Sequence, residues 1–424
     1  MDTPPATPAR AERLDFESLI APVRLEEFFS DHWERRPLHV ARGDASRYGS
    51  LVKPADLEKL ASAALDAEGA RVETLGDPGE AAGTVGSVVD AESLEAARAR
   101  GATFRLMGMQ CFWGPAATLA RRLEQRFSCP VALNLYATPP DAQGAQRHYD
   151  NHDVLVLQIE GRKLWRVYEP LVRLPLASVP PLPFEERTEE LKYARGGPRK
   201  GRADIGDRDA GAPAHEFTLE AGDALYLPRG FVHEARALGE SSVHVTIGFH
   251  VLTWLDLLTV ALGQTAQRDE RFRAALPLGL LDAHTTPDAL AEKFRALLED
   301  FARGAHPGDA LTEVAESFVR SRTGADAEPN GGEPRGYDDA TAVDLDTTLE
   351  RRPGLLCRLL EGPDSTGLAF ARQVIWMPRP FRDALAFVAR TETLRPRDIP
   401  GVSGEAGRLA LARRLVRDGL LRIR

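Results

Sequence analysis

The sequence predicts a mainly β core of jelly-roll type, a sandwich or barrel of short strands, followed by helices and a small α/β unit. Two stretches in the centre of the chain predict the core. Residues 131–136 alternate between apolar and polar side chains, and residues 154–159 are almost wholly apolar, as in a strand covered on both faces. Strong helical periodicity over residues 254–320 predicts that the chain becomes helical after this core.

The strands of the core are expected to be short and separated by Gly and Pro turns. Gly161 ends the apolar run, and residues 163–168 resume as the next strand. Two more strands are predicted over residues 224–227 and 243–251, and a helix over residues 116–127 precedes the whole series. Short strands with such turns between them are typical of a jelly roll.

The chain divides further by composition. Residues 1–14 are expected to form a disordered tail, and residues 15–253 hold the β core with its N-terminal helical elements. A long Pro-, Gly- and Arg-rich insertion at about 170–216 interrupts the core. It is either a solvated loop or a segment that contacts the substrate, and the sequence does not decide between the two. A helical region over 254–321 is followed by a linker over 322–341. The final α/β unit is then expected over residues 342–424.

Composition excludes several classes of protein. The 424 residues carry a net charge of -9, which argues against a chain whose whole surface binds nucleic acid or an anionic membrane. No run of apolar residues reaches the length of a transmembrane helix, and the first residues lack the apolar segment of a secretory signal. Cys111, Cys129 and Cys357 form no CxxC pair and are expected to be buried small hydrophobes in a reducing compartment. We therefore expect a cytoplasmic protein.

A metal site is predicted from the spacing of three side chains. His148 and Asp150 are two residues apart, so in a strand they share a face and lie roughly 6–7 Å apart. His233 follows a strand and a Pro-Arg-Gly turn that can aim it back into the core. Two histidines and one carboxylate are typical of a site that holds one face of an Fe(II) ion. His152 lies roughly 13 Å from His148 in a strand, so we leave it out of the metal ligands.

A co-ligand on the open face of that ion would be an anion, and a buried anion needs a cation at its far end. Lys163 begins the strand after the metal-site strand and is the natural candidate. The alternative is a surface lysine beside the turn at Gly161, and alternation alone leaves both open.

Residues 148–168 resemble the JmjC-type ribosomal oxygenases, a family of cupin-fold Fe(II)- and 2-oxoglutarate-dependent protein hydroxylases. The resemblance rests on an HxD pair, a Gln-x-x-Gly-Arg-Lys-x-Trp run from Gln158 to Trp165, and a Pro-Arg-Gly-x-x-His turn that ends at His233. It extends to the N-terminal helices, the helical region after Leu255 and the C-terminal segment. The insertion at 170–216 is longer than the family pattern, which leaves the substrate open.

The resemblance implies a double-stranded β-helix of cupin or JmjC type, a dimerisation role for 254–321 and a winged-helix-like domain at 342–424. It implies that His148, Asp150 and His233 bind Fe(II) and that Lys163 pairs with the distal carboxylate of 2-oxoglutarate, with O2 as the other co-substrate. The side chains implied to line the 2-oxoglutarate pocket are Asn134, Tyr136, His244 and Thr246.

The implied function is hydroxylation of a protein side chain, most readily that of a ribosomal protein, by a homodimer. Three alternatives stay open: oxidation of a peptide or small-molecule biosynthetic substrate, N-methyl demethylation, and a non-enzymatic regulator that binds nucleic acid through the C-terminal unit. The last rests on 11 arginines against 5 acidic residues from Arg379 to Arg424. A solvated arginine face is the commoner case, so no nucleic-acid partner is expected.

Overall fold

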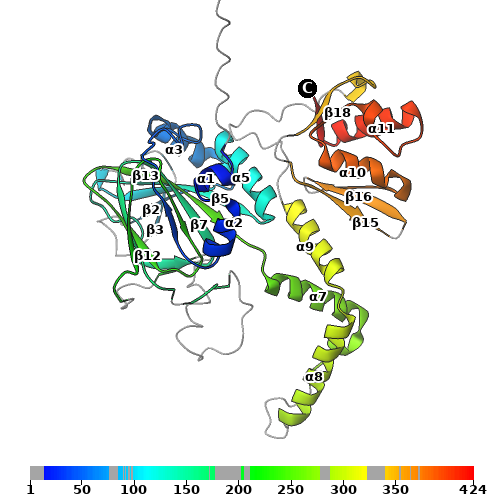
Figure 1. Cartoon of the computed structure of the whole chain (residues 1–424), viewed down its shortest axis with the longest axis horizontal. Helices are drawn as coiled ribbons and strands as arrows, with labels where there is room; N and C mark the ends of the chain where they lie inside the picture. The colour runs from blue at the N-terminus through cyan, green and yellow to red at the C-terminus, as the bar shows by residue number, and fades with distance from the viewer. Residues whose placement is uncertain are drawn as a thin grey trace, which may run out of the picture. The chain divides into compact units, whose positions relative to one another are not determined.

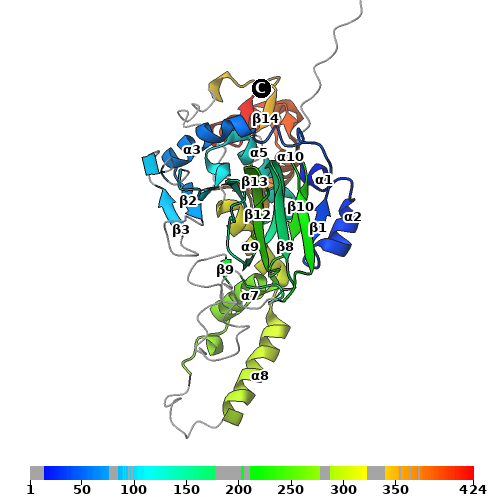
Figure 2. The ribbon, with the colours of Figure 1, turned by 90° about the vertical axis from the view of Figure 1, so that its left-hand side faces the viewer.

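The computed structural model places the predicted β core in two antiparallel sheets (Figures 1 and 2). The chain is described at residues 14–75, 99–170, 211–276, 287–321, 340–352, 355–362, 364–370 and 373–424, with shorter pieces between 85 and 96, at 172–176 and at 202–204. The predicted tail, most of the insertion and nearly all of the predicted linker lie outside these residues. The chain forms two compact units, one up to Val251 and one from Leu252 onward.

Thirteen of the described strands build the two sheets of the first unit. The larger sheet has the spatial order β1 (Leu38–Val40), β11 (Ala224–Leu227), β7 (Asp153–Glu160), β13 (Ser242–Phe249), β5 (Val131–Thr138), β4 (Thr103–Met107), β2 (Arg71–Leu75) and β3 (Val85–Val88). The smaller sheet has the order β10 (His215–Leu219), β8 (Lys163–Val167), β12 (His233–Ala237), β6 (His148–Asp150) and β9 (Arg202–Asp204).

The larger sheet is covered on both faces, as the apolar run in β7 predicted. Alternate residues of β7 point to opposite sides, and both sets are buried. One set packs on the N-terminal helices, and the other faces the smaller sheet around Trp165 and Phe231. The helices are α1 (Phe16–Ile20), α2 (Leu25–Glu27), α3 (Leu57–Asp66) and α5 (Gly114–Phe127).

The barrel form of the prediction is wrong for the described residues, whereas the sandwich form is right. The larger sheet ends at β1 and β3, and the smaller one ends at β9 and β10, so four strand edges are left without a partner strand in the described chain. The sheets meet through side chains instead of a continuous hydrogen-bond ladder. The architecture is therefore cupin-like, mainly β with helices, and open at its edges.

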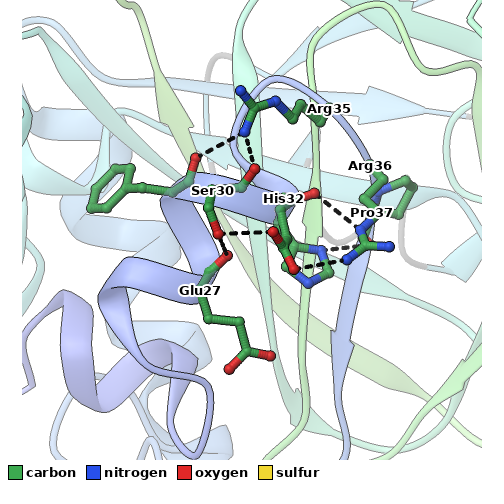
Figure 3. A network of polar contacts seen from close by, with 8 residues as sticks. Glu27, Ser30, His32, Arg35, Arg36 and Pro37 are labelled. Carbon is green, nitrogen blue, oxygen red and sulfur yellow. Dashed lines mark hydrogen bonds and ion pairs between the residues drawn. The ribbon is translucent and has the colours of Figure 1, made fainter.

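Polar contacts close the short helix η1 (Phe28–His32) and turn the chain toward β1 (Figure 3). Arg36 donates from Nε to the carbonyl oxygen of Asp31 at 3.0 Å and from its guanidinium to the carboxylate of the same residue at 3.2 Å. His32 donates from Nδ1 to the carbonyl oxygen of Pro37 at 3.1 Å. The Arg36 bond satisfies a carbonyl group at the end of the helix, the His32 bond ties the helix end to the segment that enters β1, and β1 then pairs with β11.

The second unit begins with the predicted helices, observed as α7 (Trp254–Arg268), α8 (Pro287–Gly304) and α9 (Pro307–Ser321). A capping box between Thr253 and Asp256 starts α7. Phe318 and Val319 at the end of α9 pack against the sheet of the C-terminal segment.

The described part of the C-terminal segment contains two α-helices and two small antiparallel sheets. The helices are α10 (Arg382–Arg390) and α11 (Gly404–Arg417). One sheet has the order β15 (Cys357–Glu361), β16 (Ser365–Phe370), β17 (Gln373–Pro378), and the other has the order β18 (Thr393–Leu394), β14 (Leu349–Arg351), β19 (Leu421–Ile423). The winged-helix identity of this segment stays a prediction.

Two further findings concern the predictions about membrane-spanning helices and about the cysteines. Among the described residues, no helix combines the length and the apolar character needed to cross a membrane. The three cysteines form no disulfide, and of the three only Cys129 is buried, whereas Cys357 is partly exposed and Cys111 is exposed, which corrects the prediction that all three are buried. Cys111 lies in a turn between β4 and α5, where the periodic signal that marks a buried face is missing.

Candidate metal centre

The two predicted halves of the metal site meet on adjacent strands of the smaller sheet. His148 and Asp150 lie on β6, and His233 is the first residue of β12, directly opposite His148 in the antiparallel register. One ligand atom from each of the three side chains lies within 4.8 Å of the others. The structure thus brings His233 next to His148 and Asp150, from which it is separated by more than 80 positions in the sequence.

Hydrogen bonds orient both imidazoles toward a common point. Nδ1 of His148 donates to the carbonyl oxygen of Gln146 at 2.6 Å, and Nδ1 of His233 donates to that of Phe231 at 3.0 Å. Because a carbonyl only accepts, Nδ1 of each ring carries the proton of this bond, and Nε2 is the atom that can act as a metal ligand. These Nε2 atoms lie 3.9 and 3.7 Å from the carboxylate of Asp150, so the donor set fits a divalent metal ion.

The turn before His233 depends on a glycine. Gly230 has φ +91°, and a Cβ atom there would lie 2.1 Å from the carbonyl oxygen of Val172. Its backbone N–H donates to the carbonyl oxygen of Asp150 at 2.9 Å. The Pro-Arg-Gly turn therefore delivers one ligand and anchors the backbone of another.

Lys163 is buried, which excludes the surface alternative. Only 1% of the residue is exposed, and its Nζ donates to Oγ1 of Thr138 at 2.8 Å across the gap between the sheets. His244 lies beside it, with 3.5 Å between Nζ and Nδ1. An ammonium group in such a place is available for an anion.

Burial sets the protonation of this pair. Desolvation lowers the pKa of Lys163 to about 7, with no carboxylate of the described chain to offset it. Burial, and next the nearby Lys163 ammonium, lower the pKa of His244 well below its ordinary value. Near neutral pH the imidazole is thus uncharged, and the lysine is balanced between its two forms.

The other predicted pocket residues lie on neighbouring strands of the larger sheet. In the register of β5 and β13, Tyr136 lies opposite His244 and Asn134 opposite Thr246. The rings of Tyr136 and His244 stack at 4.7 Å, and Asn134 accepts a hydrogen bond from Gly108 N–H at 3.0 Å. These four residues share one face, as alternation predicted for the pair on β5.

Three residues near this face were missed from the sequence. Thr138 extends the Asn134 and Tyr136 alternation by one step, and Trp165 stands two residues after Lys163, so alternation could have found both. The Trp165 ring lies 5.9 Å from that of His233 and 5.5 Å from that of His244. Arg105 on β4 donates to the hydroxyl of Tyr136 at 3.3 Å, and no local signal marks it.

His152, set aside as too distant, lies outside the group of three. Its ring stacks on that of His250 with 4.6 Å between centroids. Gly248 makes room for it, since a Cβ there would lie 2.7 Å from the His152 ring.

Comparison with known proteins places this geometry in a family. The JmjC domain family matches residues 110–257, which include all three candidate metal ligands and Lys163. The chain is a JmjC-domain protein. It is also a homologue of the ribosomal oxygenases: ribosomal oxygenase 1 from Homo sapiens is 35% identical over 341 residues, 74% of this chain and 48% of that protein.

A second relative and a solved structure agree with this assignment. Ribosomal oxygenase 2 from Rattus norvegicus is 31% identical over 301 residues, 68% of this chain and 59% of that protein. The JmjC chain thus spans about half the length of the relatives it matches. The E. coli ycfD structure covers 95% of this chain and 98% of its own, at a TM-score of 0.58 and 20% identity, a likeness of fold.

The first prediction concerns metal binding. Co(II) added to the metal-free chain should raise its melting temperature by several degrees, because the ligand atoms converge only in the folded state. His233→Ala should abolish this rise, measured by differential scanning fluorimetry. His215→Ala removes an exposed imidazole elsewhere on the same sheet and should leave the rise intact. An equal rise in all three proteins would show that the three side chains do not bind the ion.

The second prediction concerns Lys163 and pH. Between the folded pKa of about 7 and the ordinary value of 10.5, the unfolded chain binds a proton that the folded chain does not, so stability rises with pH in this window. Below the pKa of Lys163 in the folded protein, the lysine is protonated in both the folded and the unfolded chain. The free energy of unfolding is then reduced by the full cost of burying the ammonium charge. Lys163→Met should therefore stabilise the free protein by a few kcal/mol at mildly acidic pH, a gain that fades as pH approaches 10.5.

Urea unfolding across this pH range in the presence of a chelator measures the effect. Lys293→Met, on the surface of α8, is the control and should shift stability little at any pH. A Lys163→Met variant that is less stable than the wild type throughout would contradict the assigned desolvation cost.

Proposed function

We propose that this chain is an Fe(II)- and 2-oxoglutarate-dependent oxygenase that hydroxylates a protein side chain, with a ribosomal protein as its substrate. The observation that carries the proposal is the triad of His148, Asp150 and His233 together with the buried Lys163. The Trp165 ring connects the two, because it lies near the rings of both His233 and His244, and His244 contacts Lys163. A metal ligand set alone fits many activities. A desolvated lysine without a carboxylate partner in the described chain points to an anionic co-substrate beside the metal.

Each residue of the site has a defined part in this proposal. His148, Asp150 and His233 hold one face of the iron through two Nε2 atoms and a carboxylate oxygen. Bound Fe(II) and 2-oxoglutarate supply the activation of O2, with succinate and carbon dioxide as co-products. Lys163 binds the distal carboxylate of 2-oxoglutarate, and the approach of that carboxylate raises the pKa of the ammonium and keeps it charged.

The remaining residues orient the co-substrate and keep water away from it. Thr138 holds the Lys163 ammonium in place through its hydroxyl. Asn134, Tyr136, His244 and Thr246 line the pocket in this proposal, and the stacked rings of Tyr136 and His244 leave little room for solvent. Neutral His244 adds no second positive charge, so the pocket carries one cation for one carboxylate.

The choice of a ribosomal protein rests on the relatives. Several are ribosomal oxygenases, and E. coli YcfD, the ribosomal oxygenase of similar fold, has been solved with cobalt and 2-oxoglutarate. Oxidation of a free peptide or small molecule, and N-methyl demethylation, use the same site and differ in product. Demethylation would release formaldehyde, whereas hydroxylation leaves a substrate heavier by one oxygen atom.

The third prediction tests the reaction. Incubation of the protein with Fe(II), 2-oxoglutarate and ribosomes should yield succinate and one ribosomal protein heavier by one oxygen atom, detected by intact-protein mass spectrometry. His148→Ala should abolish both products. Lys163→Ala should mainly raise the 2-oxoglutarate KM by about 100-fold, since the lost ion pair within a dry site contributes a few kcal/mol.

The outcomes separate the alternatives. Formation of succinate without a modified ribosomal protein would indicate that the substrate is a peptide or small molecule. Formation of formaldehyde would indicate demethylation. Full activity in His148→Ala would overturn the metal assignment.

We further propose that the chain forms a homodimer through the helices of 254–321. Trp254 is 79% exposed, and three leucines of α7 follow it on the surface. Among the described residues of this region, the exposed large apolar side chains are Trp254, Leu255, Leu258, Leu262, Leu276, Phe294, Leu298 and Leu311. Burial of each such side chain against a second copy would contribute roughly 1.5–3 kcal/mol.

The fourth prediction follows. Trp254→Glu combined with Leu258→Lys should convert the dimer to a monomer in size-exclusion chromatography with light scattering, because both charges would have to be desolvated in the interface. Trp376→Glu changes the exposed tryptophan of β17 and should leave the dimer intact. A wild-type monomer, or a dimer that survives the double substitution, would disprove this interface.

The C-terminal arginines support a structural role more than a nucleic-acid one. Arg382 forms an ion pair with Glu361 at 2.7 Å, and Arg422 pairs with Glu350 at 3.0 Å. Arg413 donates from Nε to the carbonyl oxygen of Val343 at 3.0 Å. Contacts of this kind partly neutralise the positive face that phosphate binding would need. Cytoplasmic location stays a prediction.

A further inference from the structure

The strand that carries two of the three metal ligands has little backbone pairing with the strand that carries the third, although its other edge pairs with β9. β6 is three residues long, and a single residue pair, His148 with His233, joins it in register to β12. Ligand atoms must be held within about 0.5 Å of their working positions for tight metal binding. The spacing of β6 and β12 therefore needs support beyond the ladder.

Glu234, the residue after His233, provides a contact point for that support. Its carboxylate accepts hydrogen bonds from three side chains. Tyr168 donates its hydroxyl to Oε1 at 2.5 Å, Arg147 donates to the same oxygen at 3.1 Å, and Gln143 donates to Oε2 at 3.2 Å. Because the acceptor is a charged carboxylate, these hydrogen bonds are stronger than bonds between neutral groups.

These side chains come from the ends of neighbouring strands. Glu234 follows His233 in β12 and so points to the opposite face of that strand, while Arg147 directly precedes β6 and Tyr168 directly follows β8. The Arg147 guanidinium also lies over the ring of Tyr168, 4.4 Å from its centroid. The side chains of Arg147 and Glu234 are 25% and 15% exposed, which limits the screening of their ion pair by water.

We propose that Arg147, Tyr168 and Glu234 form a clamp that fixes β6 against β12 and thereby positions the metal ligands. The clamp acts through the backbone and touches neither metal nor substrate, so its members are positioning residues. The proposal rests on the metal site of the proposed function. It goes further by assigning the geometry of that site to a cluster on the opposite face of the sheet.

The same sheet offers a matched control. Arg166 and Glu216 form an ion pair at 2.8 Å between β8 and β10, which carry no metal ligand. Both side chains are about half exposed, at 47% and 51%. Loss of this pair should therefore leave the metal site unchanged.

The fifth prediction is a separation of metal affinity from stability. Glu234→Gln and Tyr168→Phe should each weaken Co(II) binding about tenfold, the lower end of what loss of a residue that orients metal ligands costs. Affinity is measured by titration of the visible Co(II) absorption, without 2-oxoglutarate, at a temperature where every variant is fully folded. Glu216→Gln should bind Co(II) like the wild type.

A purely structural role gives a different result. In that case Glu234→Gln and Tyr168→Phe would unfold at a lower temperature than the wild type. Their Co(II) affinity, measured while they are fully folded, would equal that of Glu216→Gln, and this result would refute the clamp. Tyr168→Phe removes one hydroxyl group, so it serves as the test if Glu234→Gln does not fold. A wild-type protein that binds no Co(II) would overturn the metal site itself, whereas normal binding without succinate formation would overturn only the proposed reaction.

Discussion

The register between β6 and β12 is the constraint on which the site depends. His148 stands opposite His233, and because side chains alternate along a strand, a slip by one residue would turn either histidine to the outer face. The hydrogen bond from Gly230 N–H to the Asp150 carbonyl joins the same two segments, and the Nδ1 bond of each histidine to a carbonyl of its own segment turns its ring toward the common point. Backbone pairing and ligand orientation therefore specify the same arrangement.

The buried charge of Lys163 imposes a second demand on the sheets. Desolvation that lowers the pKa of a lysine to about 7 destabilises the folded protein at neutral pH. The rest of the core must offset this, and the apolar β7, covered on both faces, is the part best suited to do so. Binding of a carboxylate would turn the same desolvation into an advantage, since a dry site strengthens the ion pair. The folded protein should therefore be more stable with a carboxylate bound beside Lys163 than without one.

The sequence allowed prediction wherever a short-range pattern carried the information. Alternation located β5, and with it Asn134 and Tyr136 on one face, while the apolar run located β7. The partnership of His233 with an HxD pair more than 80 residues away could come only from motif order. Alternation places Lys163 on the same face of its strand as Trp165 and Val167, but it does not tell whether that face is still covered at the first residue of the strand, beside the Gly161 turn.

What the sequence could not reveal depends on contacts between distant strands. Arg105 reaches Tyr136 only because β4 pairs with β5, and Tyr168 reaches Glu234 only because β8 lies beside β12. Neither pairing has a local signature, since both strands of each pair read simply as β. Cys111 is the opposite case, where composition suggested burial and a turn placed the side chain at the surface.

The insertion bears on the route that a substrate can take. Its residues 202–204 form β9, which pairs along the whole of β6. A free edge beside two metal ligands would invite an extended peptide to add as a further strand, a common mode of peptide recognition. In this chain the insertion already occupies that edge. A peptide that adds to this sheet as a further strand would therefore lie beyond β9, one strand farther from the metal ligands.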